Sequence, residues 1–281
     1  MRKSKNSPVP PGNISFMHNS KSPEGLDFFR LTDHGEDKCQ KLTDDFLAKE
    51  SGLKAPVTLE KLGTVLSLAD RIGSCFWSCP GNASGSHVIQ YLTSRTGSYG
   101  RAIIRLARLG FYDEALNLLR SLGEIGNLFT LFSLNPSAKS EWQEADKRTR
   151  IKRFGPGPVR DAVSKLGGVL LMSADEYHRL CEISTHPVPT LVPQNFNPHG
   201  RGIAGGFFQQ AGILVVLNET SVLVSAMVFL AARLCDVPEE QRLIIERECV
   251  ECVKATGEVS LSRLPEMWKD FETDKCQKVP K

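Results

Sequence analysis

Arg179 and His186 are the residues of this sequence whose types and spacing are best suited to chemistry. They stand seven positions apart, almost two helical turns, so on a helix both side chains leave one face about 20° apart. A guanidinium binds phosphate oxygens with a planar fork, and an imidazole moves protons near neutral pH. The spacing therefore predicts a site that holds a phosphate and transfers a proton.

The residues around this pair predict the helix that must carry it. Ser173 and Glu176 stand at the N-cap and N3 positions of a capping box, which is typical of a helix start. Pro187 indicates where the helix ends. Tyr177 and Ser184 lie within the same stretch, and we expect them to contribute to substrate binding.

A second predicted element is a long helix over residues 112–134, which is apolar on most sides and so belongs at the centre of a bundle. The polar residues that interrupt it are spaced by three, four and three positions and share one face: Asn117, Arg120, Glu124 and Asn127. This stripe is either the solvent-facing edge of the helix or one wall of a cleft shared with Arg179 and His186. In the cleft interpretation Glu124 is a candidate catalytic residue, and Arg120 and Asn127 are candidate substrate-binding residues.

The arginine, six-residue spacer and histidine of this pair resemble the motif of the HEPN superfamily, all-α domains that process nucleic acids. The layout is also similar to an uncharacterised, mainly microbial family of helical proteins. In that family an Arg-Ser-x-x-Glu core, here residues 120–124, precedes a segment with Tyr, Leu and His-Pro, here residues 177–187. The resemblance covers roughly residues 85–236, and each of its motifs is short.

The resemblance implies a metal-independent ribonuclease in which two protomers meet across a dimer cleft. His186 would act as general base or acid, Arg179 would stabilise the phosphate charge, and Glu124 would orient one of them. Leu180 departs from the pattern, because active members usually have a polar residue after the arginine. The alternative is a non-catalytic helical interaction or dimerisation module of the same architecture.

The fold class predicted by the pattern of apolar residues is all-α, an irregular up-down helical bundle with a flexible N-terminal arm. Residues 1–55 are predicted to be that arm, with a short helix over 37–49, and residues 273–281 a polar tail. Residues 56–272 are predicted to form the bundle, with helices over 58–74, 88–96, 100–109, 112–134, 159–165, 174–186, 219–235, 238–255 and 261–271. The polar stretch 137–158 is interpreted as either a loop with a short helix or a mobile lid.

Positive charge is concentrated in the middle of the chain, although the net charge is only +3. Eleven lysines and arginines fall between residues 101 and 160, among them Lys147, Arg148, Arg150, Lys152 and Arg153. They are either solvated helix and loop surfaces or a surface for a phosphate backbone. The expected partners are therefore RNA, a protein partner and a second copy of the chain.

The remaining sequence features favour a cytoplasmic protein without metal or cofactor. Residues 1–11 lack the apolar core of a secretory signal, and polar residues 218–220 divide the longest apolar run into pieces too short to span a membrane. Eight cysteines without a signal indicate reduced thiols. Zinc binding by Cys75, Cys79, Cys249 and Cys252 is the alternative to buried thiols, and the sequence favours the thiols.

Overall fold

The computed structural model describes residues 25–49, 54–74, 86–185, 206–235 and 237–257. In these ranges the chain forms ten helices and no strand, which confirms the predicted all-α irregular up-down bundle. The helices are α1 (Gly25–Lys49), α2 (Ala55–Ser74), α3 (Ser86–Arg108), α4 (Tyr112–Leu134), α5 (Pro136–Glu144), α6 (Lys147–Phe154), α7 (Pro156–Lys165), α8 (Ala174–Ser184), α9 (Gln210–Leu234) and α10 (Glu239–Ala255). The predicted helix over 261–271 and the tail over 273–281 lie outside the described residues.

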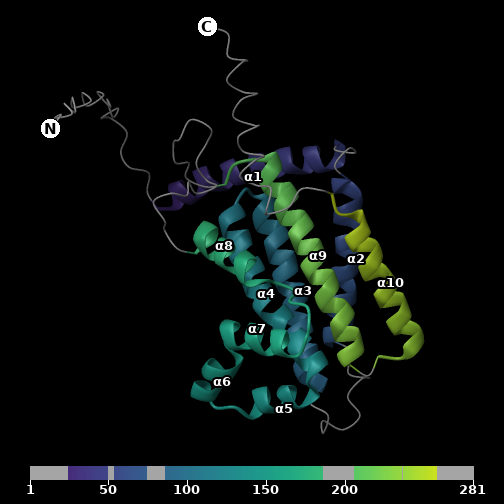
Figure 1. The fold of residues 1–281 in the computed structure, drawn as a ribbon. Helices are drawn as coiled ribbons and strands as arrows, with labels where there is room; N and C mark the ends of the chain where they lie inside the picture. Colours follow the sequence, from purple (N-terminus) through teal and green to yellow (C-terminus); the bar gives the residue numbers. More distant parts are fainter. Residues whose placement is uncertain (1–24, 50–53, 75–85, 186–205, 236, 258–281) are drawn as a thin grey trace, which may run out of the picture.

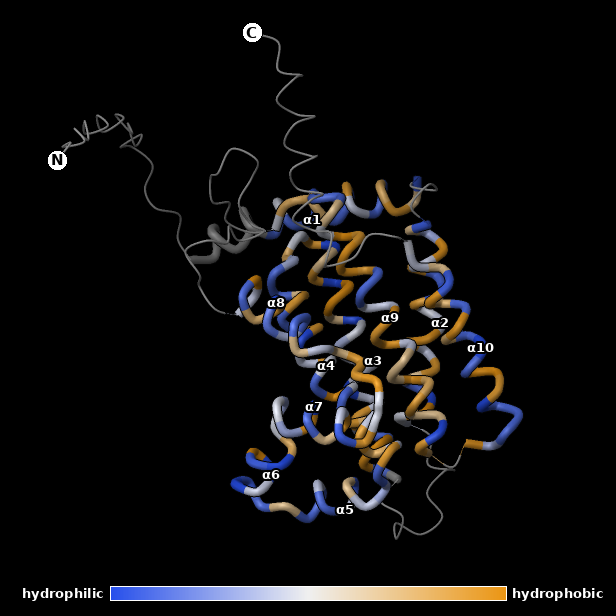
Figure 2. Tube along the Cα trace, in the orientation of Figure 1, coloured by the Kyte–Doolittle hydropathy of each residue, from blue (hydrophilic) through white to orange (hydrophobic). Residues whose placement is uncertain are grey.

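Helix α9 forms the centre of the bundle, because α2, α3, α4 and α10 all pack against it. Figure 1 shows α9 running through the middle of the molecule, with α10 beside it and α1 across one end. Its residues are apolar along most of its length, as Figure 2 shows, and 17 of its 25 residues are buried. The burial of this apolar surface is the main source of stability for a bundle of this kind.

Helix α9 corrects two predictions. It begins at Gln210, nine residues before the predicted start at Glu219, and continues through the polar residues that were expected to interrupt it. By length and composition this single helix could cross a membrane, but 72% of its most apolar window is buried inside the bundle. Asn218 fits within it because the side-chain Oδ1 accepts a hydrogen bond from the Gly257 N–H at 3.3 Å.

The start of α4 and the start of α9 lie at the same end of the bundle. The Gln209 N–H donates to the Tyr112 hydroxyl at 2.9 Å, which joins the two helix starts. Gly110 ends α3 with a φ of +86°, as a C-cap glycine does, and the Phe207 backbone nitrogen lies 2.4 Å from where a Cβ would stand. A side chain at residue 110 is thus excluded by both backbone conformation and space.

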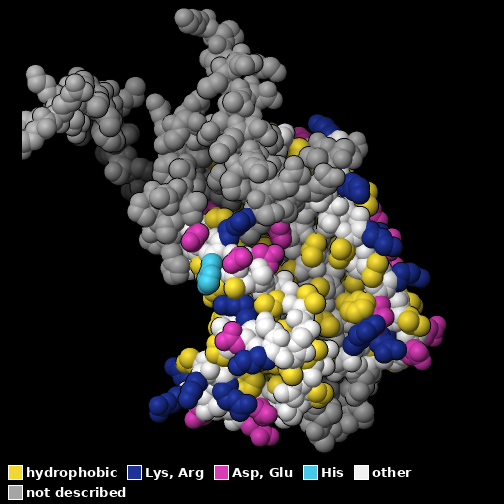
Figure 3. Space-filling model, in the orientation of Figure 1, with side chains coloured by type: hydrophobic (Ala, Val, Ile, Leu, Met, Phe, Trp, Pro, Cys, Tyr) yellow, Lys and Arg dark blue, Asp and Glu magenta, His cyan; other side chains and the backbone are white. Residues whose placement is uncertain are grey.

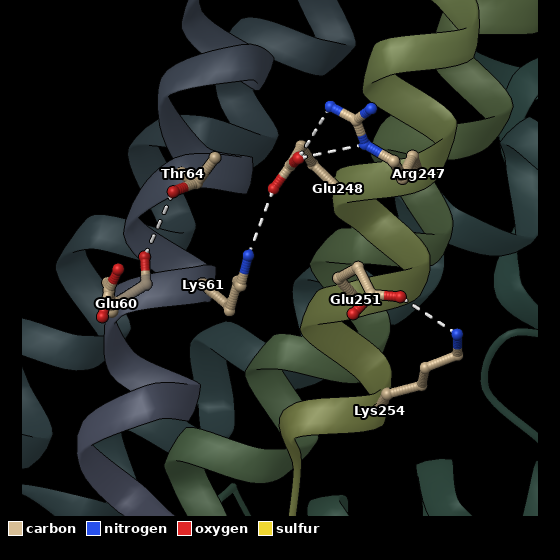
Figure 4. Close-up of polar contacts among 7 residues, drawn as sticks. All are labelled: Glu60, Lys61, Thr64, Arg247, Glu248, Glu251 and Lys254. Carbon is tan, nitrogen blue, oxygen red and sulfur yellow. Dashed lines mark hydrogen bonds and ion pairs between the residues drawn. The ribbon is translucent and has the colours of Figure 1, made fainter.

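Helix α10 packs against α2 as well as α9. The Thr58 hydroxyl on α2 donates to the Ala255 carbonyl at 2.6 Å, and the Lys61 ammonium lies 3.4 Å from a Glu248 carboxylate oxygen. Figure 4 shows Glu248 between Lys61 of α2 and Arg247 of its own helix. Pro238 is the N-cap residue of α10, whereas the sequence suggested Asp236, which lies outside the described residues.

The polar stretch 137–158 is helical for most of its length, which favours the interpretation with a short polar helix and adds a second helix to it. Helices α5 and α6 occupy it, and α7 begins at Pro156 rather than at the predicted Val159. Only Gly155 separates α6 from α7. Helix α7 can begin directly after it because Pro156 is well suited to the first turn of a helix. Helix α6 buries none of its residues.

Candidate functional site

Four side chains from three helices form a polar group that we name the Tyr177 cluster. It consists of Arg120 and Glu124 of α4, Arg160 of α7 and Tyr177 of α8. All four are half-buried. Three separate helices must be packed in place before these side chains meet, so the cluster depends on the tertiary fold.

Hydrogen bonds connect three members of the Tyr177 cluster directly. The Arg120 Nη1 donates to Glu124 Oε1 at 2.9 Å and to the Tyr177 hydroxyl at 2.8 Å. The Tyr177 hydroxyl in turn lies 3.2 Å from Glu124 Oε1, to which it donates. These bonds satisfy polar groups that the packing of α8 on α4 removes from water.

Arg160 approaches the aromatic ring of Tyr177 instead of its hydroxyl. Its guanidinium carbon lies 4.8 Å from the ring centroid, and that of Arg120 lies 5.4 Å from it, both within the range of cation–π attraction. A small pocket of about 60 Å³ opens beside the ring. Its wall includes Phe154, the last residue of α6, so the pocket joins the cluster to that basic helix.

The Tyr177 cluster carries two positive charges against one negative charge. Burial lowers the pKa of Arg120, but Glu124 and Tyr177 outweigh burial, so the pKa is raised and the guanidinium stays charged. Burial and the neighbouring Glu124 raise the pKa of Tyr177, so its hydroxyl stays protonated at neutral pH. The excess positive charge favours an anion at the pocket.

Helix α8 is positioned by its start and by one buried side chain. The capping box is present as the sequence predicted: the Glu176 N–H donates to Ser173 Oγ, and the Ser173 N–H donates to Glu176 Oε2. Leu180 is 1% exposed and packs into the core. Leu180 is therefore the apolar residue that anchors α8 to the bundle.

Asn127 and Ser184, two predicted substrate-binding residues, form hydrogen bonds to the backbone. Asn127 is buried, and its amide bonds to the backbone at Leu171 and Met172. The Ser184 hydroxyl donates to the carbonyl of Leu180, one turn earlier, at 2.6 Å. The polar stripe of α4 therefore faces α8 and the chain that precedes it, and is not simply a solvent-facing edge.

The predicted catalytic pair is only partly described. Arg179 lies on α8, two residues after Tyr177, and is half-buried. His186 and Pro187 lie outside the described residues. Glu124 bonds to Arg120 and Tyr177, and its expected contact with His186 lies outside the described residues.

Three residues near the Tyr177 cluster were not predicted from the sequence as part of the site. Arg160 appeared only as one of many basic residues, and nothing local signals that α7 turns it onto Tyr177. The Thr185 hydroxyl donates to Asn117 Oδ1 at 3.2 Å, which joins the end of α8 to α4. His178 is exposed, with its ring centroid 6.1 Å from that of Tyr177.

The cysteines of α10 lie in the core. Cys249 and Cys252 are buried, and burial raises the pKa of Cys249 to about 12. The described parts of the chain contain no group of three or more His, Cys, Asp or Glu side chains that could hold a metal. Cys75 and Cys79, the other half of the zinc alternative, lie outside those parts.

The fold and the cluster define the chain as an all-α helical bundle protein with a half-buried, positively charged site between three helices. No family model, curated protein or solved structure matches it. Its function must therefore be inferred from its own residues.

Proposed function

We propose that this chain binds RNA and cleaves it without a metal ion, through Arg179 and His186, as a HEPN-like ribonuclease. The observation that carries the proposal is the position of the Tyr177 cluster, with its excess positive charge, directly beside basic helix α6. Phe154 belongs to α6 and lines the same pocket as Arg160 and Tyr177. An RNA backbone lying across α6 would thus meet the pocket beside Tyr177. Arg179 stands two residues further along α8, about 200° around the helix from Tyr177.

Helix α6 supplies the binding surface in this proposal. Five of its eight residues are basic, and all five are exposed. Arg153 pairs with Glu141 at 2.6 Å, whereas Lys147, Arg148 and Lys152 have no ion pair among the described residues. Figure 3 shows lysine and arginine side chains gathered at this corner of the molecule. Such a group of cations favours phosphate binding by release of counterions.

The cleavage step uses the 2′-hydroxyl of the RNA as nucleophile. His186 accepts its proton as the oxygen attacks the adjacent phosphate, and Arg179 stabilises the charge that develops on the phosphate oxygens. The bond to the 5′-oxygen breaks, and that oxygen takes up a proton. The products are a 2′,3′-cyclic phosphate and a 5′-hydroxyl end.

The deciding experiment is incubation of purified protein with structured RNA in EDTA. We expect cleavage by the wild type and a loss of about 100-fold or more in His186→Ala and Arg179→Ala, the usual range for a general acid–base residue. His178→Ala is the matched control and should cleave normally. Absence of cleavage by the wild type, or equal cleavage by His186→Ala, would remove the ribonuclease proposal.

Binding is tested separately from cleavage. Arg148→Glu with Lys152→Glu should weaken RNA binding and reduce the slope of log affinity against log salt by about two. The control is Lys38→Glu with Lys41→Glu, the same change of charge on exposed residues of α1. If both double variants weaken RNA binding equally, α6 is not a specific RNA-binding surface.

The second candidate function is a non-catalytic helical interaction module. One observation favours it: Arg120, Glu124 and Tyr177 bond to one another, and the Asn127 side chain makes three hydrogen bonds to the backbone. These residues stabilise the packing of α8 on α4 without any ligand. Retained folding and RNA binding with no cleavage would support this candidate.

A further inference from the structure

We propose that residues 261–271 form a helical segment, with Ser262 as its N-cap, that packs into an apolar groove between α4, α9 and α10 of the same chain. This groove is separate from the Tyr177 cluster, and the proposal does not depend on RNA chemistry. The occupant lies outside the described residues. The argument rests on the groove, on the place where the described chain ends, and on the sequence that follows.

The groove is an apolar hollow with a volume of about 520 Å³. Helix α9 forms its floor, α4 and α10 form its sides, and residues 168–171 close one edge. Its apolar lining includes Leu134, Leu171, Ala226, Phe229, Val250 and Val253. Hydrophobic side chains are visible on this face of α9 and α10 in Figure 3.

Exposed apolar residues border this groove on several sides. Val169 is 80% exposed, Val250 42%, Leu134 41% and Val253 39%. Single exposed apolar residues are common on protein surfaces, but four around one apolar hollow form a continuous patch of the kind that marks a contact surface. The groove is therefore suited to an apolar helix face.

The described chain ends at the entrance of the groove. Val253 and Lys254, in the last turn of α10, line the groove, and the Gly257 N–H donates to Asn218 Oδ1 on α9. Asn218 stands about two helical turns before Ala226, so the groove begins roughly 10 Å along α9 from the point where Gly257 is held. The groove therefore lies within reach of a chain that continues from Gly257.

The sequence after Gly257 has the pattern of an amphipathic helix. Leu261, Leu264, Trp268 and Phe271 are spaced by three, four and three positions, which puts them on one face. The charged residues fall on the opposite face: Arg263, Glu266, Lys269 and Asp270. Ser262 is a favourable N-cap, and Pro265 then lies in the first turn, where a missing N–H costs little.

The segment is long enough to cover the groove. Nine helical residues, 263–271, span about 14 Å, whereas the α9 residues that line the groove, 225–230, span about 8 Å. Residues 256–262 provide a connection of ordinary length for two antiparallel helices. The segment would thus run antiparallel to α10 and cover the groove from end to end.

The test is hydrogen exchange, followed by mass spectrometry, on the full chain. We expect the amides of residues 264–271 to exchange about tenfold or more slowly than an unstructured peptide, unchanged on tenfold dilution of the protein. Ala226→Glu places a carboxylate in the groove and should remove that protection. Ala174→Glu on α8, at an exposed position, is the matched control and should leave it intact.

A second variant keeps the test valid if Ala226→Glu does not fold. Trp268→Glu changes no residue of the described helices, and it should abolish protection of 264–271 while α4, α9 and α10 keep most of theirs. Unprotected amides in the wild type would overturn the proposal, as would protection that survives Ala226→Glu in a folded protein. Protection that falls on dilution would assign the groove to a second copy of the chain instead.

Discussion

Asn127 offers the sharpest test of how residues beside the candidate site act. It is 4% exposed, and its amide makes three hydrogen bonds to the backbone of the chain that leads into α8. The Nδ2 donates to the Met172 carbonyl at 2.8 Å, and Oδ1 accepts from the Leu171 and Met172 N–H groups at 2.9 and 3.2 Å. Asn127→Ala leaves all three backbone groups without these partners.

The expected cost follows from these bonds. Each buried hydrogen bond contributes about 1 kcal/mol net, so Asn127→Ala should lower the free energy of unfolding by about 3 kcal/mol. Asn117→Ala is the matched control, an asparagine on the same helix that is half-buried. Its Oδ1 accepts long bonds from Arg120 and Thr185, at 3.5 and 3.2 Å, so its loss should cost about 1 kcal/mol or less.

Urea denaturation measures both variants against the wild type. The midpoint should fall markedly in Asn127→Ala with an unchanged slope, which identifies a loss of stability rather than a change in the unfolded state. A cost equal to that of Asn117→Ala would refute the reasoning. A loss of RNA affinity with normal stability would instead support the prediction that Asn127 binds substrate.

Three further outcomes are expected. Tyr177→Phe removes a hydroxyl bonded to Arg120 and Glu124 and should cost about 1–2 kcal/mol, measured by thermal unfolding, with the exposed His178→Ala as a neutral control. Gly110→Ala should destabilise by more than about 1 kcal/mol, because alanine is strained at a φ of +86° and its Cβ would meet a backbone nitrogen; an unaffected urea midpoint would contradict this. The Cys249 thiol has its pKa raised from 9.0 to about 12, so the folded state keeps a proton that the unfolded state loses. The contribution of this thiol to the free energy of unfolding is complete below pH 9 and is lost as the pH rises towards 12, by up to about 1.4 kcal/mol per pH unit. Cys249→Ala should therefore reduce the slope of the free energy of unfolding against pH between pH 9 and 12, measured by urea denaturation.

Helices with a regular apolar pattern were predictable from the sequence. Polar residues or glycines inside a helix were wrongly interpreted as the end of that helix. The predicted bounds of α4 agree with the structure, because its apolar surface and the following proline are local signals. The start of α9 was misplaced because Asn218 looked like an interruption, and its partner at Gly257 is 39 residues away. Residues 97–99 were predicted to separate two helices, over 88–96 and 100–109. They lie inside the single helix α3, where Asp70 Oδ1 comes within 2.7 Å of the position of a Cβ on Gly97.

The candidate site was predictable to the extent that it follows helix periodicity. The spacing of Arg120 and Glu124 indicated a shared face, and the capping box indicated the helix that carries Tyr177. Arg160 could not be predicted as a member, because its place beside Tyr177 depends on how α7 packs on α4. A tertiary approach of this kind leaves no spacing signal in a single sequence.

The central position of α9 has a consequence for the order in which the chain acquires structure during synthesis. An apolar helix of 25 residues is an aggregation hazard while its surface is uncovered. Three of the helices that cover it, α2, α3 and α4, precede it in the chain and leave the ribosome first. The helices that receive α9 are therefore made before α9 emerges, and among the described helices α10 alone is added afterwards. A circular permutant that places α9 first would lose this order, and we expect it to aggregate during expression even though its final contacts are unchanged.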